Sequence, residues 1–295
     1  MKNLKLHPSN DLIPLQEWIV MTGNLLTHAP TAMTNDLIYV YCMSNSHPEL
    51  ARNIELKGLK SLIFDDFYVI VKYVSESEFS EENFKKNLSD IQWLETNARE
   101  HIRVISMIME QSTVVPFKFG TIYNTKAGLK KFITDYSGSL IENFHNIKGK
   151  EEWSVKIYCE RKALCEQIDE LSEEAAALEK QFMASSPGKA FLLTRKKTDL
   201  IENEMDRLCK NYGQEYYDEF KNLSESASLN NLLPKEFTGR KDTMILNATF
   251  LVSKNKVTDF KSTVDTLRKR DGNSGFFIEA TGPWPPYNFV EITIK

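Results

Sequence analysis

The chain has 295 residues, of which 41% are hydrophobic and 26% are charged, and its formal net charge is -4. This composition is typical of a globular protein of about two domains and excludes a collagen-like, wholly disordered or disulfide-dense chain. Neither half of the sequence is strongly basic, so the chain lacks the charge pattern of a nucleic-acid-binding protein. Four scattered cysteines without a CxxC pair favour reduced thiols in the cytoplasm.

Residues 1–35 are predicted to form an N-terminal extension that is punctuated by three prolines. Its apolar residues between Pro14 and Pro30 could form a short amphipathic helix. This helix would dock on the same chain or on a partner, and docking in cis is the favoured alternative. The best apolar run, at 18–21, is too short for a signal peptide, and no run approaches the ~20 residues of a membrane span.

The first predicted domain covers residues 36–147. Residues 37–43 are apolar at both odd and even positions, so both faces of a strand there would be apolar, which predicts a buried central strand. Two further strands are expected at 61–64 and 67–74. Ser89, followed three residues later by Gln92, is typical of a capping box at the start of a helix. That helix carries one apolar stripe, formed by Ile91, Leu94, Ala98, His101, Ile105 and Ile108.

The end of this domain contains one more strand and one more helix. Residues 112–119 read as a strand, but Pro116 cannot donate to a ladder, so the strand is expected to lie at an edge or to end there. A helix of about 20 residues is predicted from Thr125, on the 3.6-residue spacing of its apolar side chains. The polar stretch at 146–150 marks the predicted domain boundary.

The second predicted domain covers residues 148–295. Strands are expected at 153–158, 244–252 and 276–280, with a helix near 257–270 and a polar loop around 224–242. Between the first two strands, a heptad repeat from Leu164 to Phe182 and a helix start at Ser186-Pro187 predict an antiparallel helical hairpin. The order indicates an α+β protein of two domains, the C-terminal one ferredoxin-like with a long helical hairpin insertion.

A search for catalytic, cofactor or metal motifs finds only near misses. Pro187-Gly188-Lys189 lacks the first glycine and the hydroxyl of a phosphate-binding loop. The stretch from Asn97 to His101 would need a second histidine to form a zinc motif, so His101 is interpreted as a core histidine. We therefore predict no catalytic, cofactor-binding or metal residues, although a site assembled from distant residues stays open.

The segment at 281–289 stands out because three of its four residues from 283 to 286 are proline. Prolines fix the backbone and leave little entropy to lose on binding, and Trp and Tyr are common interface anchors. Trp284, Pro285, Pro286 and Tyr287 are therefore the candidate partner-binding residues. The favoured alternative is a rigid tail whose rings cover the core of its own domain, and the two interpretations are compatible.

Several segments of the chain, in their order along the sequence, resemble the GvpL/GvpF family of gas vesicle proteins. The resemblance rests on residues 39–41, 93–101, 114–122, 152–158, 187–193, 247–252 and 282–290. It implies a two-domain α+β protein with a ferredoxin-like C-terminal part and no enzymatic role. It also implies assistance in assembling gas vesicles, the hollow shells that give aquatic microbes buoyancy, through contacts with the main shell protein GvpA and other accessory Gvp proteins during nucleation or formation.

The expected location is therefore the gas vesicle and the cytoplasm, with no nucleic-acid, membrane or small-molecule partner. Residues 1–35 fall outside the resemblance, so it implies nothing about them. A second hypothesis remains open, namely a small-molecule-binding or catalytic α+β protein with an unrecognised site. A deep polar pocket that holds a ligand or a metal would favour this second hypothesis.

Overall fold

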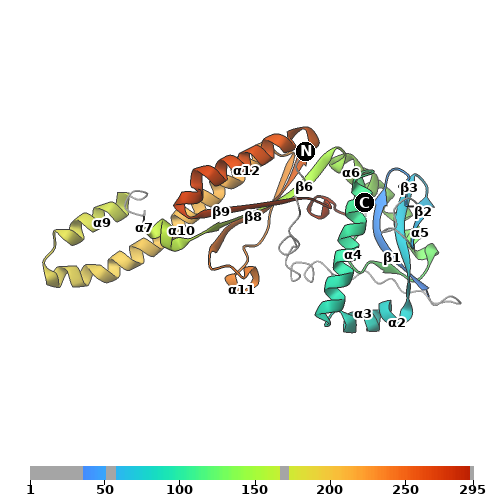
Figure 1. Cartoon of the computed structure of the whole chain (residues 1–295), viewed down its shortest axis with the longest axis horizontal. Coiled ribbons are helices and arrows are strands. Elements are labelled where there is room, and N and C mark those ends of the chain that lie inside the picture. Colours follow the sequence, from blue (N-terminus) through green and yellow to red (C-terminus); the bar gives the residue numbers. More distant parts are fainter. Residues whose placement is uncertain (1–35, 51–57, 167–172, 293–295) are drawn as a thin grey trace, which may run out of the picture. The chain divides into compact units, whose positions relative to one another are not determined.

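The computed structural model describes residues 36–50, 58–166 and 173–292 (Figure 1). The contacts between residues divide the chain into two compact units. Unit 1 contains the residues up to Glu151 together with Pro283–Lys295, and unit 2 contains Glu152–Gly282. The chain thus enters unit 2 close to the predicted boundary but returns to unit 1 at its end. That the two parts fold as separate domains stays a prediction.

Unit 1 is built on an antiparallel sheet with the strand order β2-β3-β1-β4, in which β5 also pairs with β1. Its strands are β1 (Asp36–Ser44), β2 (Leu59–Phe64), β3 (Phe67–Ser75), β4 (Val114–Pro116) and β5 (Ile122–Tyr123). β1 is buried on both faces, which confirms the central strand that was predicted from its apolar odd and even positions. β4 lies at an edge and ends at Pro116, as expected for a residue that cannot donate to the ladder.

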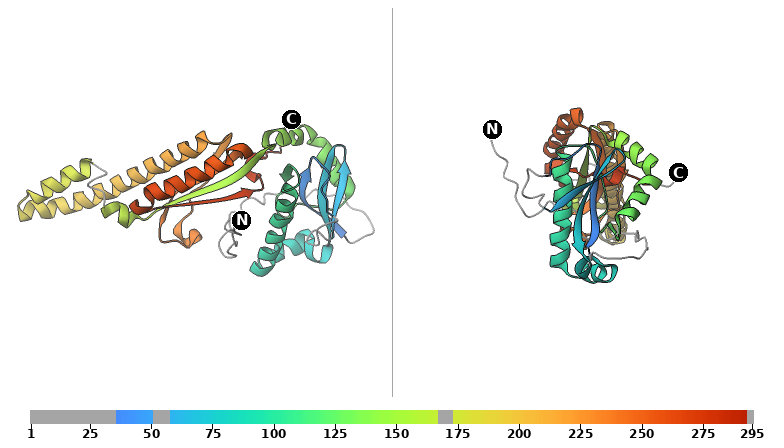
Figure 2. Two further views of the ribbon diagram at one scale, coloured as in Figure 1. Left: turned by 45° about the horizontal axis from the view of Figure 1, so that its top comes forward. Right: turned by 90° about the vertical axis from the view of Figure 1, so that its right-hand side faces the viewer.

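Helices cover both faces of this sheet (Figure 2). They are α2 (Glu76–Phe79), α3 (Glu81–Asn87), α4 (Ile91–Met109), α5 (Lys126–Asp135) and α6 (Ser137–Ile147). On one face, Leu94 and Ile105 of α4 pack with Tyr39 and Ile70 of the sheet. On the other face, the ring of Phe67 stacks on Phe144 of α6 at a centroid distance of 5.5 Å. Two layers of helices therefore enclose the strands.

Three local predictions in unit 1 were wrong in detail. The N-cap of α4 is Asp90, whose carboxylate accepts hydrogen bonds from the backbone N–H groups of Gln92 and Trp93, and Ser89 does not cap the helix. Ile91 does not belong to the buried stripe, because it is 72% exposed. The single helix expected after Thr125 is two helices, which break at Tyr136, although Thr125 does cap the first of them.

Unit 2 contains a second sheet with the strand order β7-β8-β6-β9. Its strands are β6 (Lys150–Cys159), β7 (Ser226–Leu229), β8 (Thr243–Ser253) and β9 (Phe276–Trp284), and its longer helices are α10 (Pro187–Asn222) and α12 (Val257–Asp271). The order β6-α10-β7-β8-α12-β9 is the ferredoxin-like arrangement, which confirms the predicted fold class. Phe220 of α10 and Phe260 of α12 pack on the same side of the sheet, against Val155 and Phe250.

One strand of this sheet was missed. β7 lies within the stretch that was predicted to be a polar loop, because its four residues, Ser-Ala-Ser-Leu, carry no clear apolar alternation. It pairs antiparallel with β8, with Ser226 opposite Leu251 and Leu229 opposite Ala248. The strand conformation of β7 therefore depends more on its pairing with β8 than on the β propensity of its own residues.

The predicted helical hairpin is present between β6 and β7. After α7 (Arg161–Glu166), α9 (Glu173–Met183) and the first part of α10 lie side by side and are joined by a short turn (Figure 1). With 36 residues, α10 is about 54 Å long. Leu164, the first member of the heptad repeat, is fully buried, whereas Ile168 and Leu171 lie outside the described residues.

Candidate protein-interaction site

The C-terminal tail begins at a glycine that no other residue can easily replace. Gly282 has a φ of 150°, and a Cβ atom there would lie 2.9 Å from the carbonyl oxygen of Glu152. Beyond it, Pro285 and Pro286 are buried, whereas Trp284 and Tyr287 are half-buried. The tail is therefore held in one conformation by its prolines and by this close backbone approach.

The tail is bound to unit 1, and not to the core of the second domain as expected. The ring of Tyr287 packs against the apolar cluster between α4 and the first sheet, and its hydroxyl lies 3.0 Å from Nε2 of His101. Four residues later, the carbonyl oxygen of Glu291 accepts hydrogen bonds from Ser139 Oγ (2.9 Å) and Asn143 Nδ2 (2.7 Å). The Glu291 N–H in turn donates to Asn143 Oδ1 at 3.1 Å.

His101, to which the tail binds, is fully buried and has partners at both ring nitrogens. Nε2 lies 3.0 Å from the carbonyl oxygen of Phe117, which can only accept, so Nε2 carries the proton and shares it with the Tyr287 hydroxyl. Nδ1 is then the acceptor of the Tyr39 hydroxyl at 2.9 Å. Burial lowers the pKa of His101 to about 4, against the opposing effects of the Phe117 carbonyl and Glu100. His101 is thus a neutral core histidine, as the sequence indicated.

A groove of about 670 Å³ opens beside this cluster, between β3, α2 and the first half of α4. We call it the acidic groove and define it by Tyr41, Tyr73, Glu78, Trp93, Asn97 and Glu100. Its floor is fixed by a three-residue contact: Tyr41 Oη donates to Glu100 Oε1 at 3.0 Å, and Lys72 Nζ lies 2.6 Å from the same oxygen. Burial, and then the Glu100 charge, raise the pKa of Tyr41, so its hydroxyl stays a donor.

Sequence reasoning missed this groove. Trp93, Asn97 and Glu100 recur at steps of four and three residues, so they lie on one face of α4. This spacing was the available signal, but only Asn97 and Glu100 were considered, as part of the broken zinc motif at 97–101. Tyr41 and Lys72 come from two different strands, and no local pattern connects them to α4.

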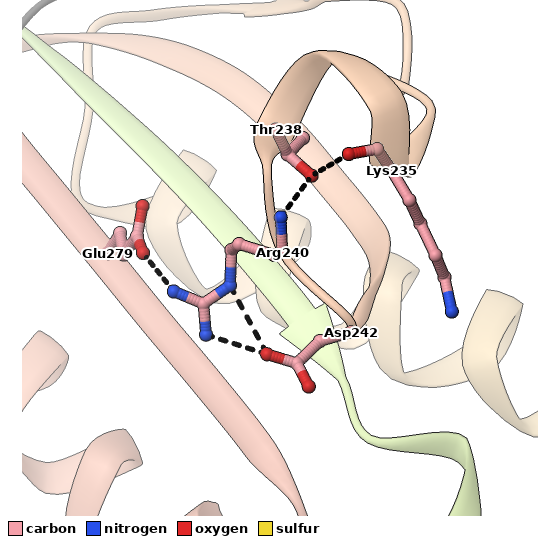
Figure 3. A network of polar contacts seen from close by, with 5 residues as sticks. All are labelled: Lys235, Thr238, Arg240, Asp242 and Glu279. Atoms are coloured by element: carbon pink, nitrogen blue, oxygen red, sulfur yellow. Dashed lines mark hydrogen bonds and ion pairs between the residues drawn. The ribbon is translucent and has the colours of Figure 1, made fainter.

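A second polar network lies on the sheet of unit 2 (Figure 3). Arg240, in the loop after α11 (Lys235–Thr238), pairs with Asp242 at 2.8 Å and with Glu279 of β9 at 2.6 Å. Its guanidinium carbon also lies 4.4 Å from the ring centroid of Tyr158. All of these contacts satisfy the Arg240 cation, so the network fastens the loop to the sheet and leaves no free charge for a ligand.

Within residues 36–50, 58–166 and 173–292, no group of three His, Cys, Asp or Glu side chains could hold a metal ion. No helix described there is both long enough and apolar enough to span a membrane. Cys42, Cys159 and Cys209 are buried free thiols, and Cys165 is exposed.

The protein is a mixed helix-and-sheet protein with two α+β units. Its distinctive features are two surfaces, the hydrogen-bonded C-terminal tail and the acidic groove. The family model described as "Gas vesicle synthesis protein GvpL/GvpF" matches residues 37–291, and the chain therefore belongs to this family. Gas vesicle protein L of a Streptomyces species is 26% identical over 88% of this chain and 94% of its own length. Gas vesicle protein F1 of Halobacterium salinarum is 26% identical over 70% of this chain and 74% of its own length.

Solved structures show the same fold. The crystal structure of GvpF from Anabaena sp. PCC7120 matches with a TM-score of 0.65 at 20% identity, and covers 88% of this chain and 99% of that one. GvpF from Microcystis aeruginosa matches with a TM-score of 0.60 at 19% identity, and covers 88% and 100% of the two chains. The family places this chain among proteins of gas vesicle formation.

Proposed function

We propose that this protein is a non-enzymatic accessory factor of gas vesicle assembly that contacts the main shell protein GvpA and other Gvp proteins at the forming vesicle. The observation that carries the proposal is the family match over residues 37–291. The state of the buried titratable groups supports a non-enzymatic role. His101 and Tyr39 bond to each other, and Tyr41 bonds to Glu100, so these groups serve the fold.

We further propose that the tail presents Trp284 to a partner, with Pro285, Pro286 and Tyr287 as its support. Tyr287 is fixed to His101, and both prolines are buried, so the backbone on the C-terminal side of Trp284 is already ordered. Trp284 itself is half-buried and follows the exposed Pro283. An aromatic side chain on a preorganised backbone loses little conformational entropy when it binds, which favours it as an interface anchor.

The test measures folding and binding on the same variants. Trp284→Ala should weaken capture of the shell protein about thirtyfold, or about 2 kcal/mol, while the melting temperature stays close to that of the wild type. Phe237→Ala is the matched control, because Phe237 is an aromatic residue of unit 2 that is 49% exposed.

Equal losses of binding in the two variants would contradict the role of Trp284. A loss of binding that only follows a loss of folding would do the same. The assembly function itself would be contradicted if the folded wild-type protein captured no gas vesicle component at micromolar concentration and its deletion left vesicle formation intact.

A further inference from the structure

The acidic groove carries more negative than positive charge. Among the residues that line it, Glu78, Asp90 and Glu100 are opposed by Lys72 alone, which leaves a formal charge of -2. Lys72 is already paired with Glu100. The Glu78 carboxylate accepts from the indole N–H of Trp93, and Asp90 caps α4, so neither is paired with a cation within the described residues.

The groove also offers acceptors that its own contacts do not use. Tyr41 and Lys72 both bond to Oε1 of Glu100, and no described residue bonds to Oε2. Asn97 donates its amide N–H to the backbone oxygen of Trp93, which leaves its Oδ1 as an acceptor. Oxygen acceptors and carboxylates in one concave surface favour a ligand that has several donors and a positive charge.

Aromatic rings complete the lining. Trp93 is half-buried, its indole N–H is held by Glu78, and its ring packs against Phe79 and Phe84 at centroid distances of 5.5 and 5.6 Å. These contacts fix the plane of the ring. A guanidinium group stacks on such a face and donates up to five hydrogen bonds in its own plane, which suits arginine better than the spherical ammonium of lysine.

We propose that the acidic groove binds an arginine side chain from an extended basic segment of a protein partner. About 670 Å³ is more space than one side chain needs, so backbone on either side of the arginine would also fit. Charge complementarity identifies this occupant: the lining is acidic, aromatic and rich in acceptors. The proposal does not depend on the proposed contact at Trp284.

A labelled peptide tests the proposal with the full-length chain. The probe is a fluorescein-labelled peptide of three glycine-arginine-serine repeats, measured by fluorescence anisotropy, with lysine and glutamate versions for comparison. We expect the arginine peptide to bind several-fold tighter than the lysine peptide, and the glutamate peptide not to bind. Glu78→Gln and Glu100→Gln should each weaken binding about threefold, and the double variant about tenfold.

These substitutions preserve the fold of the groove, because glutamine can still accept from the Trp93 indole and from Tyr41. Glu110→Gln is the matched control: Glu110 is exposed at the far end of the same helix, and its loss removes an equal charge. This variant should bind like the wild type. An equal loss in this control would show that only the overall field of the protein attracts the peptide, and would overturn the proposal.

The proposal would also be overturned if either of two other occupants filled the acidic groove. Spermidine or arginine methyl ester competing at the same concentration as the peptide would identify a site for small cations. Peptide binding that is absent in the wild type but present in a Lys2→Glu, Lys5→Glu variant would show that the chain's own N-terminal segment fills the groove. No binding of the arginine peptide to any of these forms would refute the proposal outright.

Discussion

The buried histidine that holds the tail should make the stability of unit 1 depend on pH. Burial lowers the pKa of His101 from 6.5 to about 4. As the pH falls below about 6.5, the unfolded chain therefore binds a proton that the folded chain excludes, and the free energy of unfolding decreases. A pKa difference of about 2.5 corresponds to about 3 kcal/mol, and this contribution is lost between about pH 6.5 and pH 4.

The test compares His101→Gln with the wild type by urea denaturation at pH 7, 5.5 and 4. At pH 7 the variant should be less stable by about 1–2 kcal/mol, because glutamine forms weaker hydrogen bonds to Tyr39, Phe117 and Tyr287. Glutamine also cannot titrate. Between pH 7 and pH 4, therefore, the variant should lose about 3 kcal/mol less than the wild type does. The difference between the two curves removes the acid response that the two proteins share.

His145→Gln is the control for this experiment, because His145 is exposed on α6. This variant should keep the acid-dependent loss of stability that His101 causes. If the His101→Gln profile ran parallel to the wild type, the folded protein would admit a proton at His101 at no cost. The reasoning about its buried, fully bonded ring would then be refuted.

Three further predictions follow from local geometry. Gly282→Ala should lower the free energy of unfolding by about 1–3 kcal/mol in urea titrations, whereas Gly138→Ala, which has open space, should not lower it. Arg240→Lys should cost about 1–2 kcal/mol and speed amide exchange in α11, because lysine cannot form the fork to Asp242. Cys165 should react with a thiol reagent in the native state, whereas Cys42, whose pKa is raised by burial, should react only on unfolding.

The elements with strong apolar periodicity could be predicted from the sequence. Both faces of β1 are apolar because helices cover both of them. The ferredoxin-like arrangement of unit 2 was predicted from the order of its strands and helices. β7 escaped prediction because a short polar edge strand is stabilised by its neighbour β8 and not by its own propensity.

The location of the tail could not be predicted, because nothing local to residues 283–291 indicates which apolar surface they cover. The contact between Tyr287 and His101 joins residues 186 positions apart, and the partners of Glu291 are 148 and 152 positions away. The acidic groove has the same difficulty, since its lining comes from two strands and two helices. Periodicity identifies faces of single elements, whereas these sites depend on which faces meet.

The return of the chain end to unit 1 has a consequence for synthesis on the ribosome. Unit 1 contains the residues up to Glu151 and Pro283–Lys295, so some of its hydrogen bonds depend on residues that are translated after unit 2. While unit 2 is being made, the ring of His101 lacks Tyr287, and Ser139 and Asn143 lack the backbone of Glu291. Unit 1 can therefore be completed only after unit 2 has been translated, and a product that stops near residue 282 leaves unit 1 without these bonds.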